Sequence, residues 1–232
     1  MCAWEVVGRV GILGNTLPAF SQVLHVYAET PRRALLLRSA AATLGSAAAG
    51  YCLGLCLGIG AAILARLVPL LRGGLDRLAV MVNALPVIAL APVLIITAGR
   101  AGTPAALASI PVFFLLYSST TSGLQNASPT LSLVFVSLGA SRWQQLAYLE
   151  VIAALPSMLS GMKIAAGSAM IGAIVGEWFG APSGLGVVVI NSMQNFQTAL
   201  LWATVVVIAV ITLIAYGILT LIEHTAGSRI GA

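Results

Sequence analysis

The sequence predicts an all-α protein, a bundle of helices that cross a membrane several times. Hydrophobic residues make up 59% of the chain and charged residues only 7%, and the mean hydropathy is +1.04. A soluble domain carries roughly a quarter charged residues. The apolar residues gather in runs near the roughly 20 residues that a spanning helix needs. We expect five core spans, at residues 41–64, 78–98, 104–122, 157–175 and 199–222.

The charges and cysteines exclude several other classes of protein. The formal net charge of +5 sits at the ends of apolar runs, without the basic stripe interleaved with aromatics that nucleic-acid binding requires. Cys52 and Cys56 lie within an apolar run and Cys2 is far from both, so no disulfide framework is expected. His25 and His224 are distant from these cysteines, so we expect no metal site.

The chain begins with an apolar stretch, residues 1–14, that is too short to span a bilayer and carries Glu5 and Arg9. It lacks the charged start and cleavage site of a secretory signal. It is therefore either a shortened first helix or a stub at the membrane interface. Charged residues keep the next segment out of the hydrocarbon. We divide the chain into an N-terminal stub with an amphipathic lead-in, residues 1–40, and a transmembrane domain, residues 41–232.

The first span has a small residue at every fourth position, namely Ser46, Gly50, Gly54 and Gly58. This spacing lines one helix face with small groups and lets another helix backbone approach closely. We expect that face to be a packed interface.

Two prolines interrupt the second span. Pro86 and Pro92 each remove a backbone hydrogen bond, which predicts a bent helix over residues 78–98. Such a helix can line a pore, where a polar cavity satisfies the freed carbonyls, or it can be an ordinary structural element. The sequence leaves both readings open.

The segment before the fourth span predicts two short helices that meet at a glycine. Ser128 and Pro129 form a helix start, and Gly139 ends that helix after about three turns. Ser141 opens the second helix, and Gln144 completes a capping box with it.

Both short helices carry apolar residues at helical spacing, and we expect Pro156 to mark the start of the next membrane helix. On its own, such a pair is either a packed loop or a docking element. The apolar positions are Leu131, Val134, Phe135 and Leu138 on the first helix and Trp143, Leu146 and Leu149 on the second.

The residues themselves resemble a known family. Leu138 to Gln144 reads LGASRWQ, residues 153–156 read AALP, Gly161, Lys163 and Gly167 follow, and residues 176–181 read GEWFGA. This pattern resembles the coupling loop and following helix of binding-protein-dependent ABC transporter permeases, in particular the nitrate, sulfonate and taurine branch. The resemblance implies a type I, MetI-like importer permease whose coupling loop lies at residues 128–156. The residues that it assigns to ATPase coupling are Leu138, Gly139, Ala140, Ser141, Arg142, Trp143, Gln144 and Pro156.

The match departs from the family at two places. Leu133 begins three residues that stand where Glu-Ala-Ala is usual, and Val151 and Ile152 replace a Leu-Pro pair. We therefore expect a contact with the ATPase that is weaker or differently built.

The resemblance also implies the partners and the location. The partners would be a second copy of the permease, two separate ABC ATPase subunits, an extracytoplasmic substrate-binding protein and the lipid bilayer, with no nucleic acid. The location would be a bacterial inner membrane. The transported solute would be small and anionic, of the nitrate, sulfonate or taurine kind, or a vitamin precursor, and it would pass by alternating access.

Four residues are candidates for the translocation path or its gate: Lys163, Glu177, Ser183 and Gly184. Lys163 and Glu177 stand about 21 Å apart along one helix, so they cannot pair directly. Lys163 either belongs to the path or snorkels to the headgroups. Glu177 lies near the outer gate by resemblance, or it is a solvated charge at a helix end. The glycine-rich turn after Glu177 is no phosphate cradle, because the one lysine of the chain follows Met162 rather than a glycine. We therefore expect no nucleotide or other cofactor.

Two other functions compete with an ATP-driven permease. A secondary carrier or channel usually has mid-membrane charges and repeated halves, and a membrane enzyme needs clustered catalytic groups. The sequence has none of these, so we expect no enzymatic activity. With a cytoplasmic loop, the inner arginines would be Arg66, Arg72, Arg77, Arg142 and Arg229, and the outer ones Arg32, Arg33, Arg38 and Arg100.

Overall fold

The computed structural model describes residues 2–10 and 16–230, and within these it contains helices and no strand. The elements are α1 (Cys2–Val10), α2 (Phe20–Ala28), α3 (Thr30–Leu67), α4 (Pro69–Ala84), the 3₁₀ helix η2 (Val87–Leu90), α5 (Ala91–Leu124), α6 (Pro129–Ser137), α7 (Arg142–Gln145), the π-helical turn η3 (Leu146–Glu150), α8 (Val151–Glu177), α9 (Leu185–Gln194) and α10 (Thr198–Ile230).

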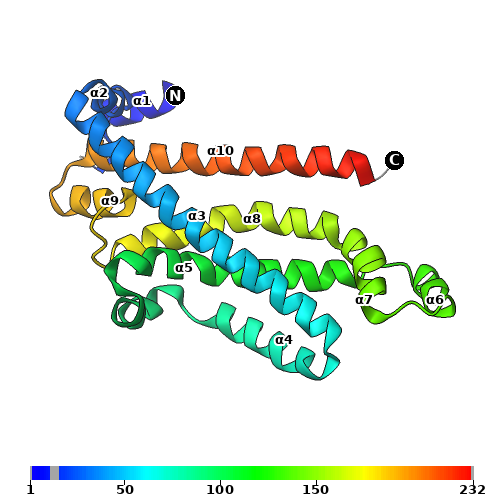
Figure 1. Cartoon of the computed structure of the whole chain (residues 1–232). Helices are drawn as coiled ribbons and strands as arrows, with labels where there is room; N and C mark the ends of the chain where they lie inside the picture. Colours follow the sequence, from blue (N-terminus) through cyan, green and yellow to red (C-terminus); the bar gives the residue numbers. More distant parts are fainter. Residues whose placement is uncertain (1, 11–15, 231–232) are drawn as a thin grey trace.

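The long helices run between two ends of the molecule (Figure 1). We call the end that carries α6 and α7 the loop end, and the end that carries α9 the α9 end. Four helical stretches are long and apolar enough to cross a membrane: Thr30–Leu67, Val87–Leu124, Arg142–Glu177 and Thr198–Thr225. Helix α4 connects the first two of these stretches, and η2 begins the second. Together these elements make the expected multi-pass, all-helical bundle.

The span expected at residues 78–98 is wrong as one bent helix. Helix α4 ends at Ala84, Leu85 is extended (φ −72°, ψ 131°), and a new helical turn starts after Pro86. The ring of a proline disfavours the α-helical conformation of the residue before it, and here Leu85 takes the extended conformation instead. Pro92 lies in the first turn of α5, where its missing N–H costs no hydrogen bond.

The glycine face of the first span packs as expected. Gly50, Gly54 and Gly58 are buried in α3 and lie against the backbone of α5. A Cβ atom at Gly54 would stand 2.6 Å from the Ser109 carbonyl oxygen, and one at Gly58 would stand 2.7 Å from the Phe113 carbonyl oxygen. Glycine is therefore required for this close approach of the two backbones.

Helix α8 is also packed on small residues. Its side that faces α5 includes Gly172, where a Cβ atom would be 2.7 Å from Ala108, and Gly176, where it would meet Pro104. A second buried stripe of small residues joins the central apolar cluster of α3, α5 and α8. The stripe consists of Gly161, Ala165, Ala169 and Ala173.

The N-terminal helices cover the α9 end. Glu5 of α1 accepts hydrogen bonds from the Ser21 N–H and hydroxyl, both at 2.9 Å, and pairs with Arg9. The backbone hydrogen bond from Ser21, followed by the interaction with Arg9, lowers the pKa of Glu5. Tyr27 of α2 donates a 2.7 Å hydrogen bond to the Ala203 carbonyl, which attaches α2 to α10, and burial raises the pKa of Tyr27.

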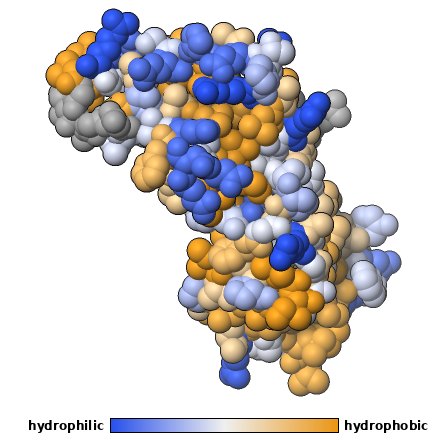
Figure 2. Space-filling model, turned by 90° about the vertical axis from the view of Figure 1, so that its left-hand side faces the viewer, coloured by the Kyte–Doolittle hydropathy of each residue, from blue (hydrophilic) through white to orange (hydrophobic). Residues whose placement is uncertain are grey.

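Many large hydrophobic side chains are exposed, as expected for a protein that lies in a membrane. Figure 2 looks onto the α9 end and shows hydrophilic side chains on its upper part and a mainly hydrophobic lower part. Exposed side chains of η2 and the start of α5 include Ile88, Val93 and Ile96. Cys52 and Cys56 are free thiols exposed on α3.

Candidate functional site

The loop between α5 and α8 has the local geometry that its sequence predicts. The Ser128 side chain accepts from the Leu131 N–H at the start of α6. Gly139 has φ 75°, a left-handed conformation that side-chain-bearing residues rarely adopt. At the start of α7 the Ser141 N–H donates to Gln144 Oε1 at 2.7 Å, and the Gln144 N–H donates to Ser141 Oγ at 3.3 Å. The predicted capping box is therefore confirmed.

The second short helix differs from the expectation in two ways. It continues through η3 into α8, so Pro156 lies inside a continuous helix rather than at its start. Leu146 and Leu149 are buried, but Trp143 is 65% exposed and does not share their face. A π-helical turn is wider than an α-helical one, which rotates the residues before it away from the α-helical spacing.

Helices α6 and α7 lie at the loop end of the molecule (Figure 1), and apolar side chains of this loop are exposed there. No residue of α6 is buried, and Leu138 beside the glycine is 79% exposed. Contiguous exposed apolar side chains are typical of surfaces that contact another protein or a membrane. The exposed residues of this surface are Leu131, Leu133, Val134, Val136, Leu138 and Trp143.

A buried carboxylate lies directly behind this surface. Glu150, at the end of η3, is 5% exposed. Arg66 lies in the last turn of α3, and its Nε–H donates a 2.7 Å hydrogen bond to Glu150 Oε2. Its Nη2 donates a second hydrogen bond to Glu150 Oε1. Arg66, Arg142 and Glu150 all line a cavity of about 260 Å³ between α3 and α7. A bidentate ion pair therefore joins the loop to α3.

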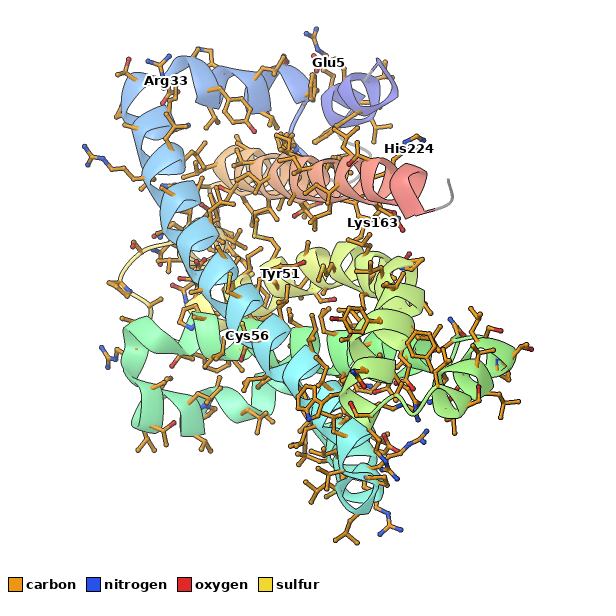
Figure 3. All side chains as sticks on the ribbon, turned by 45° about the vertical axis from the view of Figure 1, so that its right-hand side comes forward. Glu5, Arg33, Tyr51, Cys56, Lys163 and His224 are labelled. Carbon is orange, nitrogen blue, oxygen red and sulfur yellow. The ribbon has the colours of Figure 1, made fainter. Side chains whose placement is uncertain are left out.

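Lys163 is paired rather than snorkelling freely. Its ammonium binds Glu223 near the end of α10, and Ser160 Oγ donates to the same carboxylate at 2.6 Å. Figure 3 shows Lys163 between α8 and α10. Glu223 and Ser160 also line a cavity of about 590 Å³ that includes Pro156 and further serines of α5 and α8.

Glu177 is a buried group and not a solvated charge at a helix end. It is 1% exposed, and its Oε2 accepts a 2.7 Å hydrogen bond from the Gly186 N–H in the first turn of α9. Thr43 of α3 accepts from the Leu185 N–H at 2.8 Å. Because the N-cap residue Gly184 has no side chain, Glu177 and Thr43 cap α9 from two other helices.

The candidate residues thus fall into two groups. The candidate coupling residues, Leu138 to Gln144, lie at the loop end and Glu177 lies at the α9 end, whereas Lys163 lies midway along α8. Ser183 and Gly184 line a polar cavity of about 320 Å³ at the α9 end. The side chain of Arg229 lies outside the described residues.

Sequence reasoning missed three functional partners. The sequence predicts Arg66 only as an inner arginine and assigns no role to Glu150 or Glu223. The available signal for Glu150 was an acidic residue between the apolar residues Leu149 and Val151. Its partner is 84 residues away in the chain, and no local pattern identifies it.

The described residues form a helical bundle with four helices long and apolar enough to cross a membrane and a polar-capped loop at one end. Residues 54–226 match the family model described as binding-protein-dependent transport system inner membrane component, and the chain belongs to this family. It is the permease subunit of an ATP-driven importer of the inner membrane, not an enzyme, and ATP hydrolysis in such systems belongs to a separate subunit.

Known relatives cover nearly the whole chain. It is 28% identical to the formylaminopyrimidine transport permease protein ThiX of Halalkalibacterium halodurans, over 97% of this chain and 90% of the relative. It is also 28% identical to SsuC of Bacillus subtilis, named for the transport of aliphatic sulfonates, over 95% of this chain and 81% of the relative. A chain of the inward-facing MetNI methionine ABC transporter shares the fold, with a TM-score of 0.73 at 15% identity, covering 85% of this chain and 98% of that one.

Proposed function

We propose that two copies of this chain form the translocation path of the importer, with two ATPase subunits on the loop end and a substrate-binding protein on the α9 end. The observation that carries this proposal is the exposure of apolar side chains on the loop. Its second helix begins with a capping box, and no other part of the described chain covers these side chains. The exposed hydrophobic surface of α10 gives a second copy an apolar face to pack against.

The coupling role belongs to residues 128–156 in this proposal. Gly139 turns the chain sharply between the two capped helices, so α6 and α7 present their side chains to one groove of the ATPase. Ala140, Ser141, Arg142, Trp143 and Gln144 complete the contact, and Pro156 lies in the helix that carries the movement into the membrane. Residues 41–232 then form the permease domain, and residues 1–40 lead into it.

The path would run from the polar cavity at the α9 end to the serine-lined cavity at the loop end. Ser183 and Gly184 line the first, Glu177 holds the helix beside it, and Lys163 pairs at the rim of the second. The solute is small and anionic, of the sulfonate kind, or a vitamin precursor, as the names of the relatives suggest. ATP-driven closure of the ATPases would open the path alternately to either side.

Co-purification with co-expressed ABC ATPase subunits from the same organism tests the proposal. In mild detergent we expect a complex of two permease chains and two ATPases by native mass spectrometry. A monomer or a self-oligomer that binds no ATPase would refute the proposal and favour a carrier.

A substitution in the loop tests the coupling role. Gly139→Val places a β-branched residue at φ 75°, which should abolish ATPase-driven uptake while membrane insertion stays normal. Gly74→Val is the control, because Gly74 lies on exposed α4 with open space around it. Unchanged uptake in Gly139→Val would show that this turn has no coupling role.

A further inference from the structure

The ion pair between Arg66 and Glu150 joins two segments that are 84 residues apart in the chain. Both carboxylate oxygens of Glu150 accept hydrogen bonds from the one guanidinium. A planar guanidinium that binds a carboxylate through two donors fixes the angle of its partner as well as its distance. The pair therefore holds the start of the loop-to-α8 helix against the end of α3 in one orientation.

Apolar packing strengthens the same joint. Leu146 of η3 and Ala154 of α8 are buried in a cluster with Leu124 of α5. Ile63 and Leu67 of α3 pack against this cluster. The last turns of α3 and the first turns after α7 are thus held together by an ion pair and by apolar packing. The two contacts together resist sliding and rotation of one helix against the other.

Helix α3 makes two further polar contacts along its length, one with α8 and one with α9. Tyr51 of α3, labelled in Figure 3, donates to the Met162 carbonyl of α8 at 3.1 Å. Thr43, two turns further toward the α9 end, accepts from the first N–H of α9. Helix α3 is therefore held by polar contacts at the loop end, at mid-height and at the α9 end.

The contact between α3 and α5 is of a different kind. It combines the close backbone approach at Gly50, Gly54 and Gly58 with apolar side-chain packing, and among the described side chains no hydrogen bond joins the two helices. Helices in contact through shape alone can slide past each other by small shear movements. Polar contacts therefore tie α3 to α8, whereas the contact of α3 with α5 is made by close packing.

We propose that Arg66 and Glu150 are positioning residues that make α3 move as one body with the coupling loop when the ATPases bind ATP. The proposal rests on the function proposed above. Through α3, the movement of the loop reaches Thr43, and with it the α9 end of the path.

The experiment measures two distances between the two permease copies in the complex with its ATPases, reconstituted in lipid nanodiscs. One version keeps only Cys56 as a spin-label site on α3, after Cys2→Ser and Cys52→Ser. The other carries Ser137→Cys at the end of α6, with Cys56 also replaced by serine. Pulsed EPR compares the nucleotide-free state with the ATP–vanadate state. In the unmodified loop both distances should shift.

With Glu150→Gln, we expect the shift at Cys56 to fall to less than half, while the shift at Ser137 stays unchanged. The exchange Arg66→Glu with Glu150→Arg should restore the shift at Cys56. The control Arg72→Gln alters an exposed i,i+4 pair at the same end and should leave both shifts intact.

A complex in which Glu150→Gln leaves the Cys56 shift unchanged overturns the inference, and so does a parallel loss of the shift at Ser137, since the pair would then only hold the loop in shape. Failure of the unmodified chain to bind its ATPase refutes the proposed function instead.

Discussion

The contact between α3 and α5 predicts a strong difference between two glycines two residues apart. Gly58 faces α5, where a Cβ atom would stand 2.7 Å from the Phe113 carbonyl oxygen, against an ordinary contact of at least 3.4 Å. The difference, about 0.7 Å, is the distance by which the helices would have to separate. Gly60 lies on the same helix, and nothing stands within 4 Å of the Cβ position there.

Gly58→Ala should therefore destabilise the fold. A separation of this size forfeits a quarter to a half of each dispersion contact along the interface, and overpacking of this kind costs about 1–3 kcal/mol. For a chain of this length, 1 kcal/mol shifts the midpoint of thermal unfolding by roughly 2–4 °C. We expect the midpoint of Gly58→Ala to fall by roughly 2–12 °C.

Thermal unfolding of the purified chain in mild detergent, followed by tryptophan fluorescence, measures this effect. Gly60→Ala is the matched control, with the same change on the same helix, and its midpoint should stay level or rise because alanine favours the helix. Equal midpoints for Gly58→Ala and Gly60→Ala would refute the assignment of the glycine face to close packing.

Three further results are expected. Glu177→Ala leaves the Gly186 N–H buried without an acceptor, at a cost of about 1–3 kcal/mol, so hydrogen exchange in α9 should accelerate, while Glu177→Gln keeps an acceptor oxygen and should change it less. Ser141→Ala removes one half of the capping box with Gln144, at about 1 kcal/mol, and should accelerate exchange in α7 but not in α9. The pKa of Glu5 is lowered in the folded state, so its stabilising effect is present above the ordinary carboxyl value of 4.5 and is lost as the pH falls below it. The protection of α1 against exchange, measured relative to the intrinsic rate at each pH, should therefore fall at acid pH, and in Glu5→Gln it should be low at every pH.

Local chemistry made much of the fold predictable. The capping box at Ser141 and the glycine face of α3 follow from residues three or four positions apart, and the structure has both. Such patterns act within one helix or on one helix surface, so the sequence contains everything needed to recognise them.

Other features depend on the geometry between elements. The break at Pro86 and the π-helical turn at Leu146–Glu150 both involve a choice between backbone conformations that neighbouring helices decide. The partner of Lys163 comes from the last helix, 60 residues on, and the buried site of Glu177 exists only because α9 folds back onto it. A charge at a predicted helix end does not reveal whether it faces water or another helix.

Helix α3 has a consequence for the membrane around the protein. Its 38 residues extend over about 57 Å, nearly twice the roughly 30 Å of hydrocarbon in a bilayer. The first turns of α3 carry Arg32, Arg33 and Arg38 and lie outside the hydrocarbon, so the apolar part, residues 41–64, is about 36 Å long. An apolar length greater than the hydrocarbon thickness is accommodated by tilting, and α3 already runs obliquely to its neighbours (Figure 1). Because Thr43 of α3 caps α9, a change of tilt reaches α9 as well. Lipid chain length thereby becomes a variable that acts on the geometry of this permease.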